Sequence, residues 1–520
     1  MSCFYGENRN LLIQYNIDIN LRRSDLMAVT EEQAVKLFNK LVDVCSVVAK
    51  DAHVFIGTHD LKRSPLFMDK YPALSTDFFL DDKYFKEEDR ERIPFLKYRI
   101  PKYEMKRYPE DKKYYSAIFE SYRTEYINLK KYENIDEIKR WIDSEPEVLR
   151  LFSDHEQVPD YLIRGIVNDI VERYLYLTNA TEVIPDNIEK VIKPYVSERL
   201  LFYLEETLYF DICIPICLAT FDKEEIQLDE NVEIIRIPEE IQKARQITCK
   251  YEVTKEDWVA ACATHMIVLH NYNYKKGENY SFNSIMQDYA CYPLEKIDEI
   301  FGVIRVATGY QIGYEHIFCI PEGWICETTA DLSAVYGAKS HFVNSKFIKM
   351  DWMNLPVSCV TKTQCGEIVL LYKEYQNNAK KLKFPLMRFN RCMLRDEVDD
   401  MTTDACIGLE SLLAGNAHAE ITNAIASRIP FVFSKVVDSG YLAANGRGYM
   451  RKIYNLRSRI VHGDELKDKY LYIDNGEDRI YIPQMAVDFL RITLLFMIKN
   501  PTYLEVEEID AFVDSLVAKP

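Results

Sequence analysis

The segment from Arg447 to Gly463 carries apolar residues at steps of three and four, which is the spacing of one face of an α-helix. One apolar row consists of Tyr449, Ile453, Leu456 and Ile460, and a second row beside it consists of Met450, Tyr454, Arg457 and Val461. Gly463 is a natural residue for a helix end, so we expect His462 in the last turn, where the helix dipole favours an imidazolium. The first row would face the core, and the second would meet another helix or a second copy of the protein.

Arg457 and His462 are five residues apart, which places their side chains about 140° apart around the helix axis. An Arg and a His at this spacing occur in many proteins by chance. The simplest interpretation is an Arg in an ion pair and a His that binds the last carbonyl groups of the helix. Whether the two form a functional site therefore depends on the sequence around them.

A chain of 520 residues is long for one domain, so we expect two or three. Its composition, 48% hydrophobic and 28% charged, is that of a globular protein. The 13 cysteines include no C-x-x-C pair, and Cys213 and Cys217 have no histidine pair at ligand spacing, so we interpret them as reduced core thiols. The start, Met1 to Arg22, is polar, and no apolar run reaches the roughly 20 residues of a membrane span. We therefore expect a cytoplasmic protein without a membrane partner.

The formal net charge of −17 argues against broad, non-specific binding to nucleic acid. The charge is unevenly distributed, because residues 361–520 contain 21 basic and 22 acidic residues, whereas residues 1–360 contain 44 and 60. Two basic runs have no acid between their members, and they consist of Lys380, Lys381, Lys383, Arg388, Arg391 and Arg395, and of Arg447, Arg451, Lys452, Arg457 and Arg459. In an acidic protein such runs indicate an anionic ligand, and the alternative is two solvated helix faces.

The chain is expected to divide into three regions. Residues 1–205 would be mainly helical, residues 206–360 would mix strands and helices, and residues 361–520 would form a helical bundle. Helical patterns in the first region cover Glu31–Ala52 with Thr30 as N-cap, Lys112–Leu129, Ile135–Asp143, Tyr161–Leu177 and Asn187–Leu204. In the third region they cover Glu367–Asn378, Leu382–Leu394, Asp399–Leu413, Ile421–Val437, Arg447–His462, Pro483–Lys499 and Glu505–Val517. The predicted fold class is α+β and multidomain, with a mixed α/β N-terminal part and an all-α C-terminal bundle.

Strand patterns dominate the middle region. They cover Phe210–Ala219, Val232–Ile237, Tyr251–Val253 and Met266–Leu269, and they precede a helix at Leu294–Thr308 and a hairpin within His316–Cys326. His265 and His270 would point to opposite faces of a strand, so we interpret them as packed or hydrogen-bonded and not as a metal pair. The sequence contains no recognisable cluster of metal ligands and no glycine-rich phosphate loop, so we expect no metal and no cofactor.

Two stretches of the C-terminal third resemble the HEPN superfamily, and within it the Apea-like HEPN domains. Thr403–Leu413 carries an Asp and the sequence Leu-Glu-Ser-Leu-Leu, and it looks like that family's acidic helix. Tyr454–Gly463 looks like the family's Tyr-x-x-Arg-Ser-x-Ile-Val-His-Gly signature. The resemblance covers residues 362–520. The full signature downstream of the acidic helix is much more specific than an Arg and a His alone.

The resemblance implies a dimeric endoribonuclease that needs no metal, because the attacking group is the RNA 2′-hydroxyl. Arg457 would bind the scissile phosphate and His462 would act as general acid or base, in a cleft shared by two copies of the chain. Ser458 would orient His462 or the phosphate. Flanking RNA phosphates would be bound by Arg459, Arg451 and Lys452.

Asp404 and Glu410 lie six residues apart on the acidic helix. A buried carboxylate there needs a partner, and Arg457 is an available one. The alternative is a surface pair that bridges helices. We favour a structural or supporting role for both acids.

Two functions are compatible with these patterns. In the first, the protein is a ribonuclease effector in antiphage defence or a toxin–antitoxin system. It would cut tRNA, mRNA or a viral transcript, and residues 1–360 would bind a protein trigger or inhibitor. In the second, it is a non-catalytic helical module for dimerisation or for binding a ligand or a protein. The basic helices favour the first function, whereas the overall acidity and the lack of a recognisable RNA-reading domain favour the second.

Overall fold

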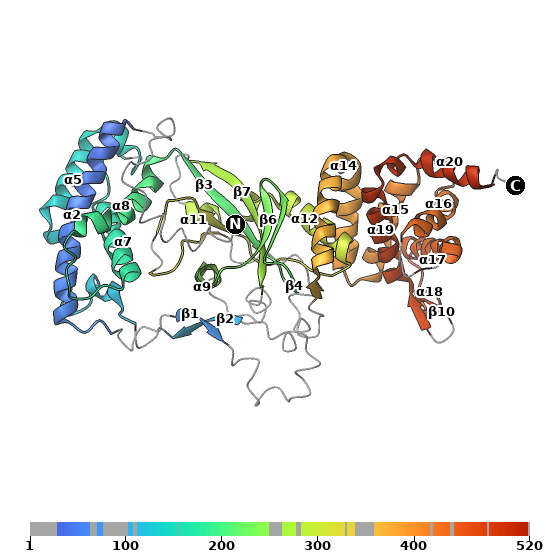
Figure 1. Ribbon diagram of the computed structural model, residues 1–520, viewed down its shortest axis with the longest axis horizontal. Helices are drawn as coiled ribbons and strands as arrows, with labels where there is room; N and C mark the ends of the chain where they lie inside the picture. Colours follow the sequence, from blue (N-terminus) through green and yellow to red (C-terminus); the bar gives the residue numbers. More distant parts are fainter. Residues whose placement is uncertain are drawn as a thin grey trace, which may run out of the picture.

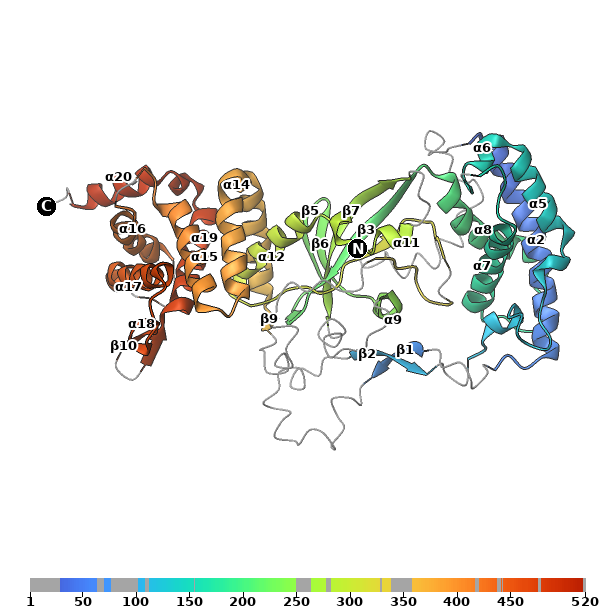
Figure 2. The same ribbon diagram turned by 180° about the vertical axis from the view of Figure 1, so that it is seen from behind.

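The computed structural model describes residues 29–62, 70–75, 102–107, 112–153, 155–248, 263–276, 282–327, 330–337, 358–416, 420–436, 441, 443–475 and 478–517. The molecule is elongated, and three groups of elements follow one another along its long axis (Figures 1 and 2). Helices of the N-terminal region lie at one end, a β-sheet lies in the middle, and the C-terminal helices lie at the other end. The combination of helices and sheet confirms the α+β class.

The N-terminal region is a group of helices. They are α2 (Glu31–Thr58), α5 (Glu133–Ser144), α6 (Pro146–Leu149), α7 (Asp160–Thr178) and α8 (Ile188–Leu204). Helix α2 begins where the sequence predicts, because Thr30 and Gln33 form a capping box in which each side chain accepts a hydrogen bond from the other residue's backbone N–H. The helix continues past the predicted Ala52 to Thr58.

The predicted helix Lys112–Leu129 is wrong. Only two short 3₁₀ turns form there, at Tyr115–Ile118 and Leu129–Lys131. The apolar residues of this segment are buried within one turn and are not spread along a helix face, and the Tyr115 hydroxyl donates to the carbonyl oxygen of Ala180 at 2.8 Å. Tertiary contacts therefore override the helical spacing.

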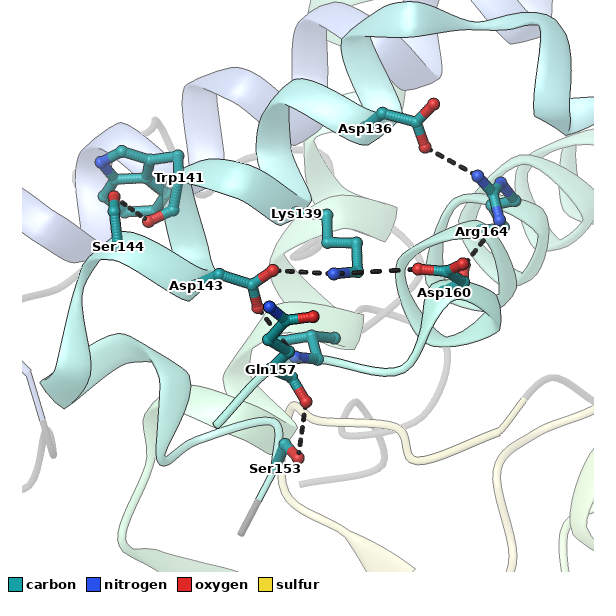
Figure 3. A network of polar contacts seen from close by, with 10 residues as sticks. Asp136, Lys139, Trp141, Asp143, Ser144, Ser153, Gln157, Asp160 and Arg164 are labelled. Atoms are coloured by element: carbon teal, nitrogen blue, oxygen red, sulfur yellow. Dashed lines mark hydrogen bonds and ion pairs between the residues drawn. The ribbon is translucent and has the colours of Figure 1, made fainter. Parts of the chain in front are cut away.

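Polar contacts join α5 to the start of α7 (Figure 3). The Lys139 ammonium lies 2.7 Å from Asp143 on its own helix and 3.7 Å from Asp160. The Arg164 guanidinium donates to Asp136 at 2.7 Å and to the Asp160 carbonyl oxygen at 2.8 Å. Because these groups are partly exposed, each pair contributes at most about 1 kcal/mol. They orient the two helices, and apolar burial supplies most of the stability.

Glu172 of α7 is the most unusual acid of this region. The Ser116 hydroxyl and the Asn168 amide, the latter at 3.3 Å, donate to its carboxylate. Burial is the main cause that raises the pKa of Glu172 to about 7, and the nearby Asp169 carboxylate adds to the effect. The folded protein therefore holds this proton at pH values where the unfolded chain has released it.

A Glu172→Gln variant is expected to be more stable than the wild type above pH 7. The raised pKa makes the free energy of unfolding fall as pH rises from about 4.5 to about 7, and Gln removes that loss. We expect a gain of roughly 1–3 kcal/mol at pH 8 and little change at pH 4.5. Thermal unfolding at the two pH values measures it, and an equal gain at both would contradict the shifted pKa.

A five-stranded antiparallel sheet forms the middle of the molecule, with strand order β5-β6-β7-β3-β8. The strands are β3 (Thr207–Pro215), β5 (Glu225–Asp229), β6 (Val232–Arg236), β7 (His265–Lys275) and β8 (Phe318–Pro321). Helix α9 (Glu239–Thr248) packs on one face, and α12 (Leu294–Thr308) has the bounds that the sequence predicts. Two small strand pairs lie outside this sheet, β4 (Ala219–Phe221) with β9 (Ser358–Val360) and β1 (Lys70–Ser75) with β2 (Lys102–Arg107). The predicted strand Tyr251–Val253 lies outside the described residues.

The histidines of β7 are hydrogen-bonded, as predicted. His265 Nε2 lies 3.1 Å from the carbonyl oxygen of Lys223, and burial lowers the pKa of His265 to about 4. His270 lies between the carboxylates of Asp211 and Glu233, each 3.1 Å away. The hydrogen bond to Asp211 is the largest cause that raises the pKa of His270 to about 10, so this imidazole carries its second proton at neutral pH.

The predicted hairpin within His316–Cys326 is wrong. Only β8 forms, and it pairs with β3. After β8 the chain turns inward, where the Trp324 indole stacks on Tyr336 and donates to the Tyr209 carbonyl oxygen at 2.8 Å. The segment after β8 is therefore held by the packing of Trp324, and it does not continue as the second strand of the predicted hairpin.

The C-terminal region consists of helices and one hairpin. The helices are α14 (Lys362–Leu394), α15 (Val398–Leu413), α16 (Ile421–Lys435), α17 (Ala443–His462), α18 (Asp468–Leu471), α19 (Ile482–Lys499) and α20 (Val506–Val517). The two predicted helices from 367 to 394 are one long helix with a non-helical residue at Asn378. Pro483 lies in the first turn of α19, as predicted.

The prediction that this region is all-α is wrong. β10 (Tyr472–Asn475) and β11 (Asp478–Tyr481) form an antiparallel hairpin between α18 and α19. Tyr472 pairs with Tyr481 across the strands. We did not predict this hairpin, although the Asn-Gly dipeptide that begins at Asn475, flanked by Tyr and Ile residues, is a hairpin signal in the sequence.

A buried contact between α12 and α14 joins the middle and C-terminal regions. Arg305 of α12 is 1% exposed, and burial lowers its pKa to about 10. Its guanidinium donates to the Ile312 carbonyl oxygen at 2.9 Å and to the Asn390 side chain at 2.8 Å. The Asn390 amide donates in turn to the Asp298 carbonyl oxygen at 2.7 Å. Gly302 lets the two helices approach this closely, because an added Cβ would lie 2.8 Å from Cγ of Leu386.

A Gly302→Ala substitution is expected to destabilise the protein by about 1–3 kcal/mol, since the methyl group would push Leu386 and Asn390 away from α12. Gly366 of α14 is the matched control, because a Cβ there meets nothing within 4 Å. Gly366→Ala should raise stability by roughly 0.5–1 kcal/mol through helix propensity. Urea unfolding measures both values, and equal behaviour of the two variants would contradict the close approach at Gly302.

Candidate functional site

Helix α17 ends as the sequence predicts. Its last residue is His462, and Gly463 adopts the left-handed conformation with φ of +71°. The Gly463 N–H donates to the Ile460 carbonyl oxygen and the Asp464 N–H donates to that of Arg459, each at 3.0 Å. This pattern is a Schellman motif, which requires a residue that tolerates positive φ. The cap therefore fixes where the helix stops and where His462 projects.

His462 lies on the exposed side of α17. The row of exposed residues consists of Arg447, Arg451, Asn455, Ser458 and His462. Within the described chain, the side chains of Ser458 and His462 make no hydrogen bond to each other or to another residue. The imidazole is thus open to a ligand from solvent, and Ser458 does not orient it.

Arg457 lies on a different side of the helix, where it faces α15. One of its terminal nitrogens is 3.7 Å from the Glu410 carboxylate, and the Tyr454 hydroxyl donates to the same carboxylate at 3.1 Å. Burial raises the pKa of Tyr454, with the nearby Cys406 and Glu410 as further causes, so its phenol stays a neutral donor. The hypothesis that Arg457 pairs with an acid of the earlier helix is correct for Glu410.

Asp404 has another partner. Its buried carboxylate accepts a hydrogen bond from Arg388 of α14 at 2.6 Å. Arg457 is therefore not the group that compensates Asp404. The Asp404–Arg388 pair connects α15 to α14 and supports the packing of these two helices.

Most residues of the second row of α17, defined above as Met450, Tyr454, Arg457 and Val461, have contacts within one chain. Met450 and Tyr454 are buried in the core of the C-terminal region, so these two residues do not require a second copy. Val461 is the exception, because it is 62% exposed. Of the two expectations for this row, another helix or a second copy of the protein, the first is correct for Met450 and Tyr454, and Val461 alone is left exposed for a second copy.

The two basic runs differ in how their charges are compensated. On α14, four of the six cations are in ion pairs, namely Lys381 with Glu505, Lys383 with Glu295 and Glu299, Arg388 with Asp404, and Arg395 with Asp400. On α17, no ion pair to a described residue involves Arg447, Arg451 or Lys452, and all three are exposed. The uncompensated positive charge is therefore concentrated on the helix that ends at His462.

Arg459 is the basic residue of α17 that is most firmly held. Its Nε–H donates to Asn455 at 3.1 Å and one terminal nitrogen donates to Asp464 at 3.2 Å. The guanidinium carbon lies 3.7 Å from the centre of the Tyr470 ring. The four-residue step to Asn455 is readable in the sequence. The contact with Tyr470 was missed, because it depends on how the chain turns after Gly463.

Comparison with known proteins adds no relative. No family model, no curated protein and no solved structure matches the chain. In the described part of the chain, no group of three or more His, Cys, Asp or Glu side chains is arranged to hold a metal ion. The helices of that part include none with the length and apolar character needed to cross a bilayer.

An Asp404→Asn variant is expected to lose about 1–3 kcal/mol of stability, because the charge of half-buried Arg388 would be left uncompensated. Asp400→Asn is the matched control, since its pair with Arg395 is about half exposed. The control should change stability by less than about 0.5 kcal/mol. Chemical denaturation measures both, and a neutral Asp404→Asn would contradict the structural role of this acid.

Proposed function

We propose that the protein is a metal-independent endoribonuclease whose general acid or base is His462. The observation that carries this proposal is the open imidazole at the end of α17, in one exposed row with Arg447 and Arg451. A phosphate backbone that follows such a row would meet two cations before it reaches the imidazole. The signature shared with HEPN domains, Tyr454–Gly463, supports the same assignment.

The reaction needs a base and an acid. The RNA 2′-hydroxyl loses its proton to the base and attacks the adjacent phosphorus. The bond from phosphorus to the 5′-oxygen breaks, and the acid gives a proton to that oxygen. The products are a 2′,3′-cyclic phosphate and a 5′-hydroxyl. One imidazole supplies one of the two proton transfers, so a second His462 from another copy of the chain would supply the other.

A homodimer is therefore part of the proposal. Two copies that meet across the ends of their α17 helices would place two imidazoles at one RNA strand. The exposed Val461 next to His462 gives such a contact an apolar residue. Within one chain, Arg457 and His462 project about 140° apart, so the scissile phosphate would not meet both from a single copy.

The alternative is a non-catalytic interaction module. The observation that favours it is that Arg457 faces Glu410 and Arg459 is held by Asp464, so two arginines of the motif already have acidic partners. In this alternative the exposed row would bind an anionic partner without cleaving it.

A His462→Ala variant is expected to cleave RNA at least 10²-fold more slowly than the wild type, because it lacks the proton-transfer group. Purified proteins would be incubated with tRNA and with mRNA in excess EDTA, and product ends would be mapped. Arg391→Ala is the matched control, since Arg391 is an exposed cation of α14 without an ion-pair partner among the described residues. It should cleave like the wild type.

Cyclic phosphate ends that disappear in His462→Ala would support the proposal. Equal cleavage by the wild type and His462→Ala would contradict the assignment of His462 as the proton-transfer group. No cleavage by the wild type would favour the interaction module. Light scattering of the same samples at micromolar concentration tests the dimer, and a strictly monomeric active enzyme would exclude a shared site.

A further inference from the structure

We propose that Tyr470 is a positioning residue for RNA, which holds the Arg459 guanidinium beside His462 so that Arg459 binds the phosphate presented to that imidazole. This inference rests on the proposed function and adds to it the arginine that faces His462 from the same chain. Arg459 thereby becomes a binding residue at the reacting phosphate, and Tyr470 acts through it.

The helical repeat places Arg459 and His462 together. Side chains three residues apart on a helix are neighbours, with Cβ atoms about 5–6 Å apart. Arg457 is five residues from His462 and faces Glu410 on α15. A phosphate within reach of His462 is therefore also within reach of Arg459. Arg457 projects from a different side of the helix and faces away from such a phosphate.

The contacts of Arg459 leave its phosphate-binding edge available. A guanidinium has five N–H donors, of which Asn455 and Asp464 use one each. Tyr470 covers one face of the plane, and the side chain remains 29% exposed. The remaining donors make no hydrogen bond to another described residue. They form the kind of planar fork that binds two phosphate oxygens at once.

Tyr470 is placed by the turn that ends α17. After Gly463 the chain reverses, and the Tyr470 N–H donates to the Lys467 carbonyl oxygen at 2.8 Å in the short helix α18. The ring then lies under the Arg459 guanidinium, and the Lys469 ammonium is 4.9 Å from the same ring. A flexible arginine is thus fixed before RNA arrives, so binding restricts it less.

The adjacent hairpin contains a matched contact of the same kind. The Arg479 guanidinium carbon lies 4.0 Å from the centre of the Tyr472 ring, and Arg479 is paired with Asp468 and Asp474. This stack is on β10 and β11, beyond the end of α17. It therefore controls for the general effect of removing a tyrosine from beneath an arginine.

The experiment compares Tyr470→Leu, Tyr470→Phe and Tyr472→Leu with the wild type. Fluorescence anisotropy would measure the binding of a single-stranded RNA with 2′-O-methyl groups, which lacks the attacking hydroxyl. Cleavage kinetics would use the same sequence with 2′-hydroxyls. We expect Tyr470→Leu to weaken binding and raise KM about tenfold, with kcat within about twofold of the wild type. Tyr470→Phe keeps the ring and should behave like the wild type, as should Tyr472→Leu.

An Arg459→Lys variant provides the second test, because it keeps the charge and removes the planar fork. It should lose as much affinity as Tyr470→Leu, provided that circular dichroism shows both proteins folded. Unchanged binding by Tyr470→Leu, or an equal loss in Tyr472→Leu or Tyr470→Phe, would overturn the inference.

The outcomes separate this inference from the proposed function. Cleavage by the wild type without any effect of Tyr470→Leu would contradict the positioning role alone. Binding that depends on Tyr470 without cleavage would contradict the ribonuclease alone. A wild-type protein that does not bind the 2′-O-methyl RNA would contradict both.

Discussion

The buried contact of Arg305 with Asn390 is the constraint on which the C-terminal region depends. It holds α12 against α14, which also contacts strand β5 of the central sheet and packs on α15 and α19. A buried guanidinium is costly unless its donors find partners, and here Nε and one terminal nitrogen of Arg305 are bonded while the other terminal nitrogen has no hydrogen-bond partner among the described residues. Moving α14 would remove the Asn390 partner as well, so this crossing has few alternative arrangements. Because α15 carries the Glu410 carboxylate that faces Arg457, the position of α17 relative to the sheet follows from the same contact.

Charge compensation decides which basic helix is available to a ligand, and it cannot be read from the order of residues. The cations of α14 meet acids that lie far along the chain, such as Glu295 for Lys383 and Glu505 for Lys381. The acids of other elements therefore compensate most of the positive charge in the basic run of α14. On α17, Arg457 and Arg459 face acids, whereas Arg447, Arg451 and Lys452 have no ion-pair partner among the described residues, so their positive charge remains at the surface of the helix that ends at His462.

Local signals predicted those parts of the fold that depend on neighbours in the chain. The capping box at Thr30, the bounds of α12 and the end of α17 at His462 follow from residues within a few positions. The failures involve distant partners. The 112–129 segment is held by the loop after α7, and Asp404 pairs with an arginine of another helix. The hairpin β10–β11 was also missed, although its Asn-Gly dipeptide lies between two predicted helices, in a segment without a predicted element.

The helical repeat itself divides the candidate site into two sides. A residue five positions before the last residue of a helix projects away from the side chain of that last residue. A residue three positions before it projects on the same side. Arg457 therefore contributes to the packing of α17 on α15, and Arg459 shares the solvent side with His462. Since the Schellman motif reverses the chain immediately after His462, the segment that follows returns toward that side and brings Tyr470 under Arg459. The helical repeat thus sets which arginine lies on the side of His462, and the glycine that ends the helix lets the following segment bring Tyr470 to that arginine.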